Sequence, residues 1–254
     1  MDKAFVIGDI HGNYELLEKI LTKWNPGEEQ LVFLGDYIDR GPDSLKVLRK
    51  VIDLTHNHGA IALSGNHEHI FLYWLKNTEK TSEFYFHDKV GGIATIHSFY
   101  PEMRENIILN EVNVLELASK VKKEYSSEID FLKSLVSYYK WDGYLFVHAG
   151  IDTHVEDFKK TKDENFYWIR EDFYAKPHLA KEIVVFGHTP TINLNEDKGN
   201  QVWVSPCHKK IGIDGGVIYE HGQLHGIVFT KGSNELLVYA AKRTEDVFSY
   251  TVTI

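Results

Sequence analysis

Five short apolar runs along the chain each end in a cluster of polar or charged residues. The runs cover residues 3–8, 31–35, 60–63, 144–147 and 183–186. Apolar runs of this length, bounded by turn residues, are typical of buried strands. Between the first runs the sequence predicts amphipathic helices, one beginning near Tyr14 with Asn13 as its cap and one over 44–55. Strands that alternate with helices predict an α/β fold whose ligand site lies at the carboxyl ends of the strands.

Two later segments break this alternation. Residues from about 71 to 140 contain a run of aromatic residues and a charged stretch over 111–139, which predict a helical insertion that caps or flanks the site. The last part, about 200–254, predicts short β segments at 202–205, 211–213, 217–219, 224–229, 235–240 and 247–253. Their pattern predicts a second, largely antiparallel sheet packed on the first. Because we find no internal repeat and no low-complexity linker, we expect residues 1–254 to form a single domain.

Composition and charge narrow the class of protein. The 254 residues are 43% hydrophobic and 26% charged, which is typical of a globular protein with a sizeable core. The formal net charge of −9 argues against a nucleic-acid polymer or an anionic membrane as partner. No apolar run approaches the roughly 18 residues that a membrane helix needs, and the first strand leaves no room for a signal peptide. A single cysteine, Cys207, precludes an intramolecular disulfide, so we expect a cytoplasmic protein.

The polar clusters after the five runs carry groups that bind metals and phosphate. They contain Asp9, His11, Asp36, Asp39, Arg40, Asn66, His67, His148 and His188. Gathered carboxylates need a cation or an arginine beside them, and mixed carboxylate and imidazole ligands suit Mn, Fe, Zn or Co better than Ca²⁺. These ligands are too many for one ion, and a carboxylate can bridge two. The pattern therefore predicts two divalent ions bridged by Asp36, with Arg40 holding a phosphate beside them.

The same clusters form five motifs in a defined order. They are Gly8-Asp9-Ile10-His11-Gly12, Gly35-Asp36-Tyr37-Ile38-Asp39-Arg40-Gly41, Gly65-Asn66-His67-Glu68, His148-Ala149-Gly150 and Gly187-His188-Thr189. Together they resemble the motifs of the calcineurin-like metallophosphoesterases. More narrowly, they resemble the PPP family of protein serine/threonine phosphatases in its compact bacterial and phage form, over residues 8 to about 216. The resemblance implies a two-sheet metallophosphoesterase sandwich flanked by helices, with a helical insertion.

The resemblance also implies a ligand set for two divalent transition-metal ions. Mn²⁺ is the ion expected first, with Fe, Zn, Co or Ni as alternatives. The ligands implied for the first ion are Asp9, His11 and Asp36. The ligands implied for the second ion are Asp36, Asn66, His148 and His188. Asp36 is therefore the implied bridge between the two ions.

Further residues receive catalytic and substrate-binding roles from the same resemblance. His67 is the implied acid that protonates the leaving alkoxide, and Asp39 orients His67 and raises its basicity. Arg40 and Arg170 are the implied ligands of the phosphoryl oxygens, although Arg170 could instead pair with the acidic residues that follow it. Many family members carry arginine where this chain has Ser64, so one phosphate contact is missing or supplied elsewhere.

The implied function is hydrolysis of phosphoserine or phosphothreonine on proteins by direct attack of a metal-activated hydroxide, without a phospho-enzyme. The alternative is a symmetrical diadenosine tetraphosphate hydrolase, or another phosphoesterase with a small substrate. Because that dinucleotide group typically lacks the complete second motif, Asp39 favours the phosphatase. A metal-binding regulatory protein without turnover should have lost His67 or Arg40, and both are present. The histidines expected to be incidental are His69, His87, His97 and His208.

Overall fold

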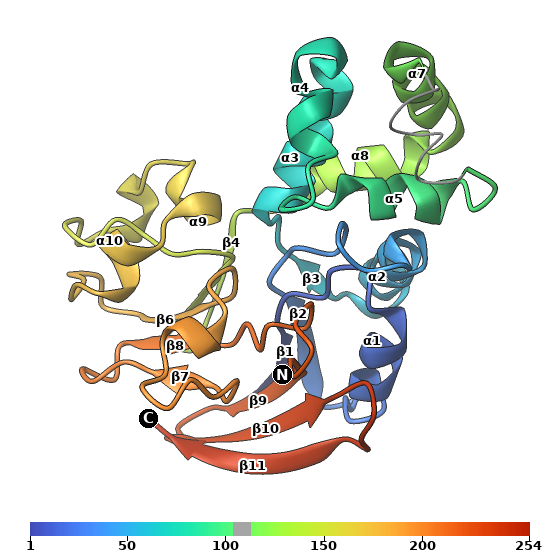
Figure 1. Cartoon of the computed structure of the whole chain (residues 1–254). Helices are drawn as coiled ribbons and strands as arrows, with labels where there is room; N and C mark the ends of the chain where they lie inside the picture. The colour runs from blue at the N-terminus through green and yellow to red at the C-terminus, as the bar shows by residue number, and fades with distance from the viewer. Residues whose placement is uncertain (104–112) are drawn as a thin grey trace.

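Two β-sheets pack face to face, with helices on their outer faces and further helices above one common end (Figure 1). The computed structural model describes residues 1–103 and 113–254. The first sheet contains, in spatial order, β11 (Phe248–Thr253), β10 (Glu235–Ala241), β9 (Leu224–Thr230), β1 (Lys3–Ile7), β2 (Glu29–Phe33) and β3 (Ile61–Ala62). The second contains β4 (Tyr138–Trp141), β5 (Tyr144–Val147), β6 (Ile183–Phe186), β8 (Lys210–Gly212) and β7 (Trp203–Val204). This is the α/β, two-sheet fold that the sequence predicts.

The central strands are apolar on both faces because both faces are covered. In β1, Phe5 and Ile7 pack in a core shared with the helices, whereas Ala4 and Val6 pack in the core between the sheets. Successive side chains of a strand point to opposite faces, which explains this alternation. A third core lies between the second sheet and the segment that follows β5. The continuous apolar runs in the sequence therefore correspond to strands buried between two layers.

Helices cover the outer faces of both sheets. The first sheet is covered by α1 (Tyr14–Leu21) and α2 (Ser44–His58), and the second by the short helices α9 (Asn165–Trp168) and α10 (Glu171–Tyr174). Within residues 1–103 and 113–254, short turns of 3₁₀-helix also occur at η1 (Phe158–Lys160) and η2 (Thr191–Asn193). Asn13 occupies the position before α1 but does not cap it, because its amide donates to the carbonyl oxygens of Ile10 and His11 instead. None of the described helices is long and apolar enough to cross a membrane.

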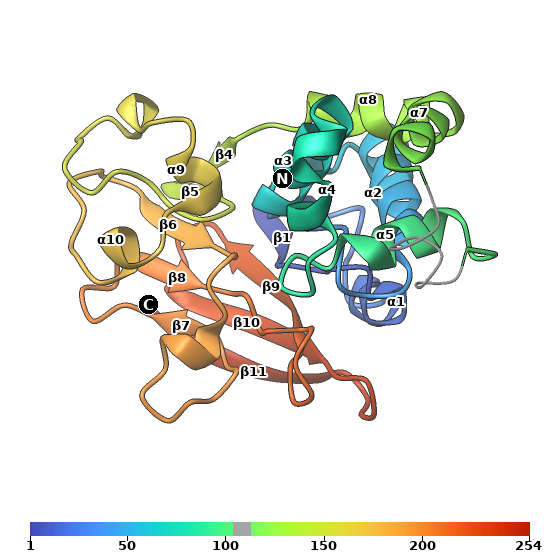
Figure 2. The same cartoon turned by 45° about the horizontal axis from the view of Figure 1, so that its top comes forward.

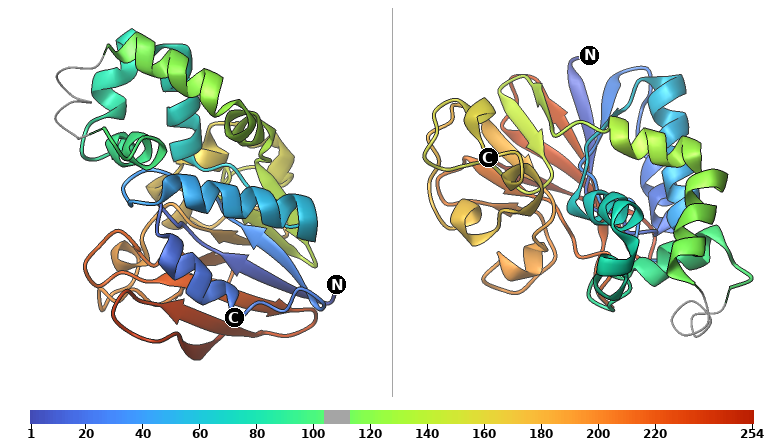
Figure 3. Two further views of the ribbon diagram at one scale, coloured as in Figure 1. Left: turned by 90° about the vertical axis from the view of Figure 1, so that its right-hand side faces the viewer. Right: turned by 90° about the horizontal axis from the view of Figure 1, so that it is seen from above.

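A helical insertion lies above the common end of the strands. Its described helices are α3 (Asn66–Lys76), α4 (Thr78–Tyr85), α5 (Gly92–Phe99), α7 (Val114–Glu124) and α8 (Ser126–Ser134). In the view from above, these helices and the segment with α9 and α10 lie on opposite sides of the strands (Figures 2 and 3). The predicted helical stretch over 111–139 is wrong at its end, where Tyr138–Trp141 form β4, and residues 111–112 lie outside the described part.

The expected composition of the second sheet is also wrong. Strands β7 and β8 join the second sheet, but β9, β10 and β11 extend the first, because β9 pairs antiparallel with β1. Residues 217–219 form turns and no strand. The sequence signals that these segments are strands, but not which existing edge each will pair with, since period-2 alternation carries no information about the partner.

A buried histidine links the two sheets and predicts how stability depends on pH. His225 in β9 is hydrogen-bonded through Nδ1 to the Ile213 carbonyl oxygen and through Nε2 to the Gln223 amide. Burial lowers the pKa of His225 to about 4, from 6.5. The unfolded chain binds this proton more tightly than the folded protein does. The contribution of neutral His225 to the free energy of unfolding is therefore complete above the pKa of the unfolded state, and it is lost as the pH falls toward the pKa of the folded state.

We therefore expect wild-type protein, kept in chelator, to lose about 2 kcal/mol through His225 between pH 7 and pH 5. His225→Gln has no such group, so its free energy of unfolding should fall less over the same interval. Urea denaturation of both proteins at the two pH values measures the difference. An equal fall in both would show that His225 does not titrate with a depressed pKa.

Candidate metal centre

Both sheets deliver polar residues to one shared edge. The predicted site residues follow β1 (Asp9 and His11), β2 (Asp36, Asp39 and Arg40), β5 (His148) and β6 (His188), or begin α3 (Asn66 and His67). All of them except Arg40 are buried. Two parallel pairs, β1 with β2 and β5 with β6, end at this edge, and the face-to-face packing of the sheets brings their ends together.

Asp36 lies at the centre of the cluster. Ligand atoms of His11, Asp36 and His67 lie within 4.8 Å of one another. A second group with the same property consists of Asp36, His148 and His188. The Asp36 carboxylate is 3.5 Å from His11 Nε2 and 3.4 Å from His148 Nε2. Because Asp36 belongs to both groups, the arrangement is compatible with two ions that share this carboxylate.

Two further predicted ligands border these groups. The Asn66 side-chain oxygen is 3.0 Å from His148 Nε2 and 2.8 Å from His188 Nδ1. The Asp9 carboxylate accepts a hydrogen bond from the His188 backbone N–H at 3.0 Å and lies outside both groups. Gly187 permits this approach, because a Cβ at that position would collide with an Asp9 oxygen. The structure thus brings Asp9, which follows a strand of the first sheet, into contact with His188, which follows a strand of the second sheet.

Backbone carbonyl groups orient two of the imidazoles. His11 Nδ1 is 3.0 Å from the Ile38 oxygen, and His148 Nδ1 is 2.9 Å from the Leu34 oxygen. A ring nitrogen that faces a carbonyl oxygen carries the proton, which leaves Nε2 of each ring as the electron-pair donor. Burial also lowers the pKa values of His11, His148 and His188. Neutral imidazoles with oriented lone pairs are the form that binds metal ions.

The carboxylates repel one another without a cation between them. Burial raises the pKa of Asp9 well above its usual range, and the nearby carboxylates of Asp214 and Asp36 raise it further. Asp214 is itself buried, and burial raises its pKa to about 6. Asp214 is not among the residues predicted from the sequence, although it follows the apolar end of β8 as the other residues of the cluster follow their strands.

These residues fit a pair of divalent cations. His188 Nε2 is a buried polar atom without a hydrogen-bond partner among the described residues. Three buried carboxylates gathered beside several neutral imidazoles are costly unless positive charge lies between them. The donor set, nitrogen from histidine and oxygen from aspartate and asparagine, suits Mn, Fe or Zn. The chemistry of this cluster is therefore compatible with a dinuclear metal site.

His67 forms a buried pair with Asp39 beside the cluster. His67 Nδ1 lies 2.8 Å from Asp39 Oδ2, and both side chains are buried. Burial opposes a charge on His67, but the carboxylates of Asp36 and Asp39 outweigh this effect and raise its pKa. A histidine that binds its proton more tightly near neutral pH suits a general acid.

The helical insertion holds Asp39 in place. Asp39 Oδ1 accepts hydrogen bonds from the Tyr85 hydroxyl in α4 at 3.1 Å and from the Thr95 hydroxyl in α5 at 2.7 Å. All three side chains are fully buried. Tyr85 and Thr95 are not predicted from the sequence, because no local motif marks a hydroxyl that donates to a distant carboxylate. These two residues fix the carboxylate that in turn faces His67.

Tyr85→Phe tests this positioning role. Loss of one hydroxyl donor should reduce turnover by about tenfold on a substrate with a poor leaving group, with unchanged metal content. A substrate with a good leaving group, such as p-nitrophenyl phosphate, needs less help from an acid and should be affected less. The matched control is Tyr125→Phe, which removes a hydroxyl that donates to the Phe99 carbonyl. Equal losses on both substrates would contradict a role through His67.

The two arginines lie at opposite ends of the cluster. Arg40 Nη1 is 2.9 Å from His11 Nε2, and Arg170 Nη1 donates to the His188 carbonyl oxygen at 2.8 Å. The expected alternative for Arg170, pairing with its acidic neighbours, is not seen among the described contacts, since Asp172 pairs with Lys176. Both arginine residues are exposed, at the rim of the cluster. Ser64 is buried beside it and supplies no positive charge.

Glu68 joins two of the loops that carry the ligands. Its carboxylate accepts hydrogen bonds from the backbone N–H groups of Asp36, Tyr37 and Gly65 at 2.8–2.9 Å. Burial and the charge of Asp36 raise the pKa of Glu68 to about 7, although these three hydrogen bonds oppose the shift. Gly65 lies so close to Asp36 that a Cβ there would collide with its carboxylate. The Gly-Asn-His-Glu motif is therefore built to approach Asp36 closely.

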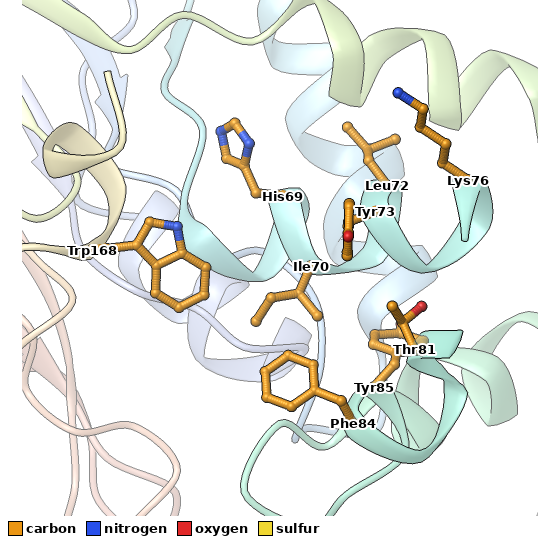
Figure 4. Close-up of a pocket in the computed structure, with 9 residues that line it drawn as sticks. All are labelled: His69, Ile70, Leu72, Tyr73, Lys76, Thr81, Phe84, Tyr85 and Trp168. Carbon is orange, nitrogen blue, oxygen red and sulfur yellow. The ribbon is translucent and has the colours of Figure 1, made fainter. Parts of the chain in front are cut away.

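An aromatic groove adjoins the His188 end of the cluster. Its volume is about 440 Å³. It is lined by His69, Ile70, Leu72, Tyr73, Lys76, Thr81, Phe84, Tyr85 and Trp168. Trp168, from α9, faces Ile70 and Phe84, from α3 and α4 (Figure 4). The Trp168 ring lies 6.5 Å from the His188 ring, so the groove borders the candidate ligand cluster at Trp168.

This fold and cluster define a metal-binding hydrolase of phosphate compounds. Residues 3–229 match the model of the calcineurin-like phosphoesterases, and the chain belongs to that family. It is 28% identical to an asymmetrical bis(5′-nucleosyl)-tetraphosphatase of Oceanobacillus iheyensis, over 75% of this chain and 78% of that protein. The chain is also 44% identical to serine/threonine-protein phosphatase 2 of Escherichia coli, over 25% of this chain and 28% of that protein. A solved structure provisionally named as a diadenosine tetraphosphatase has a TM-score of 0.57, at 21% identity and 95% coverage of both chains.

Proposed function

We propose that this chain hydrolyses a phosphoric anhydride bond of a bis(5′-nucleosyl) tetraphosphate at the metal centre. The observation that carries this proposal is the aromatic groove at the His188 end of the cluster (Figure 4). Tyr73, Phe84 and Trp168 are all exposed although they are large and apolar. Aromatic side chains beside a phosphate site are suited to stack a nucleobase.

Two further observations support a nucleotide substrate. His69 Nε2, at the groove, is buried without a hydrogen-bond partner among the described residues, and a base or ribose could provide one. The tetraphosphatase of Oceanobacillus iheyensis matches three quarters of both chains, whereas the named phosphatase matches about a quarter. The likeness to the tetraphosphatase thus extends well beyond the part of the chain that the phosphatase matches.

The proposed reaction divides its tasks among residues of the cluster. Asp9, His11, Asp36, Asn66, His148 and His188 would hold the two ions, which when bound polarise the phosphoryl group and lower the pKa of a water. Arg40 and Arg170 bind and orient the phosphoryl oxygens from opposite ends. The water releases one proton to solvent, and its oxygen, with the other proton, bonds to phosphorus as the bridging P–O bond breaks. The leaving oxygen keeps the electron pair and takes the proton from His67, and solvent later returns a proton to His67.

Hydrolysis of phosphoserine or phosphothreonine is the second candidate function. It is favoured by the buried pair of His67 and Asp39, because an alkoxide leaving group needs a proton far more than a phosphate does. The local identity to the Escherichia coli phosphatase also supports it. Both candidates use the same metal centre and differ in what occupies the aromatic groove.

Protein loaded with Mn²⁺ should be offered a dinucleoside tetraphosphate and a phosphoserine peptide side by side. We expect a higher kcat/KM for the dinucleotide, and Trp168→Ala should raise its KM by about tenfold through lost stacking. Leu179→Ala, which removes an exposed apolar side chain elsewhere, is the control. Preference for the peptide by orders of magnitude would overturn the proposal in favour of the second candidate.

A further inference from the structure

A cleft with a different character opens at the other end of the metal cluster. Its volume is about 800 Å³, and it lies between the insertion and the C-terminal loops. The cationic residues at its wall are Arg40, Lys89 and Arg243. Asp88 is the acidic residue at the wall. This balance is unusual for a chain with a formal net charge of −9.

Short contacts place the three cationic residues near the loop that carries His11. Arg40 Nη1 contacts His11 Nε2 at 2.9 Å, and Arg40 Nη2 donates to the Lys89 backbone oxygen at 3.4 Å. Arg243 Nη2 donates to the Asn13 side-chain oxygen at 3.1 Å, and the Asn13 amide donates to the His11 carbonyl oxygen at 2.8 Å. The cleft therefore lies beside His11, one of the candidate metal ligands, through Arg40 and Asn13 in its wall.

These cations have no acidic partner in the described part of the chain. Many other lysines of the protein pair with a carboxylate within 4 Å, but Arg40, Lys89 and Arg243 do not. All three are exposed. Exposed cations gathered around one cleft attract an anion. A single phosphate at the metal ions would need only Arg40 and Arg170 as its cationic partners.

We infer that this cleft binds the remaining phosphates of a polyphosphate chain, with Lys89 and Arg243 as the residues that recognise them. The inference rests on the proposed function and specifies how the substrate lies. One nucleoside occupies the aromatic groove at the His188 end, the scissile phosphate lies at the metal centre, and the rest of the chain extends past Arg40. Ile93, Ile218 and Tyr219 supply apolar surface in the same cleft for the second nucleoside, beyond the phosphates.

The test compares inhibition of p-nitrophenyl phosphate hydrolysis by tripolyphosphate and by orthophosphate, in excess Mn²⁺. Tripolyphosphate should inhibit wild-type protein more strongly, and Lys89→Ala should raise its Ki about tenfold with less effect on orthophosphate. Arg243→Ala should act in the same direction. The matched control is Lys80→Ala, a lysine of the same insertion that lies outside the cleft, and any chelation of metal by tripolyphosphate affects it equally.

The outcomes separate this inference from the proposed function. If the Ki ratio of the two inhibitors is the same in wild type, Lys89→Ala and Lys80→Ala, the cleft does not bind polyphosphate and the inference is wrong. If the ratio changes as expected while a dinucleoside tetraphosphate is not cleaved, the cleft is a polyphosphate site and the proposed substrate is wrong. Cleavage of the dinucleotide with a KM raised by Lys89→Ala supports both.

Discussion

Asp36→Asn should leave the protein folded but without stoichiometric metal. Asp36 is the carboxylate shared by both groups of candidate ligands, so its charge serves two ions at once. The amide keeps an oxygen that can accept the hydrogen bond from the His67 backbone, now 3.1 Å from Asp36 Oδ1. Asparagine also tolerates the positive φ of 54° at this position. The expected loss is therefore one of charge rather than of fold.

Elemental analysis after dialysis and a turnover assay with p-nitrophenyl phosphate measure this loss. Wild type should retain close to two ions per chain, and the variant well below one. Turnover should fall by more than about 10³-fold, because several kcal/mol of charge stabilisation disappears with the ions. Asp130→Asn removes an exposed carboxylate on α8 and should behave as wild type. Retention of two ions by Asp36→Asn would argue against the shared ligand.

The cluster of candidate ligands could be predicted from the sequence because each part of it is local. Every candidate ligand lies within a few residues of the end of an apolar run, and strand ends of an α/β fold gather at one edge. The prediction did not require the correct sheets: β5 and β6 belong to the second sheet, yet His148 and His188 still reach Asp36. Spacing along the chain therefore predicts the site better than it predicts the topology.

What the sequence could not predict depends on contacts between distant segments. Tyr85 and Thr95 are 46 and 56 residues from Asp39, and only the packing of the insertion brings their hydroxyl groups to its carboxylate. The pairing of β9 with β1 joins the two ends of the chain in the same way. The histidines outside the motifs were expected to be incidental, yet His69 lies at the aromatic groove. Such roles have no periodic or compositional signal.

His67→Asn separates the acid from the metal ligands. The pair with Asp39 and the raised pKa indicate an acid, but His67 also lies within 4.8 Å of His11 and Asp36, so it could be counted as a ligand. An acid and a ligand differ in what their removal changes. Without the acid, the leaving group must depart unprotonated, whereas without a ligand an ion is lost.

We expect His67→Asn to keep close to two ions per chain and to lose about 10²–10⁴-fold in turnover on a phosphoserine peptide or another poor leaving group. The loss on p-nitrophenyl phosphate should be much smaller, because its leaving group departs without a proton. His221→Asn, at an exposed turn, is the matched control. Loss of one ion together with equal losses on both substrates would make His67 a metal ligand, and Asp39 would then orient a ligand rather than an acid.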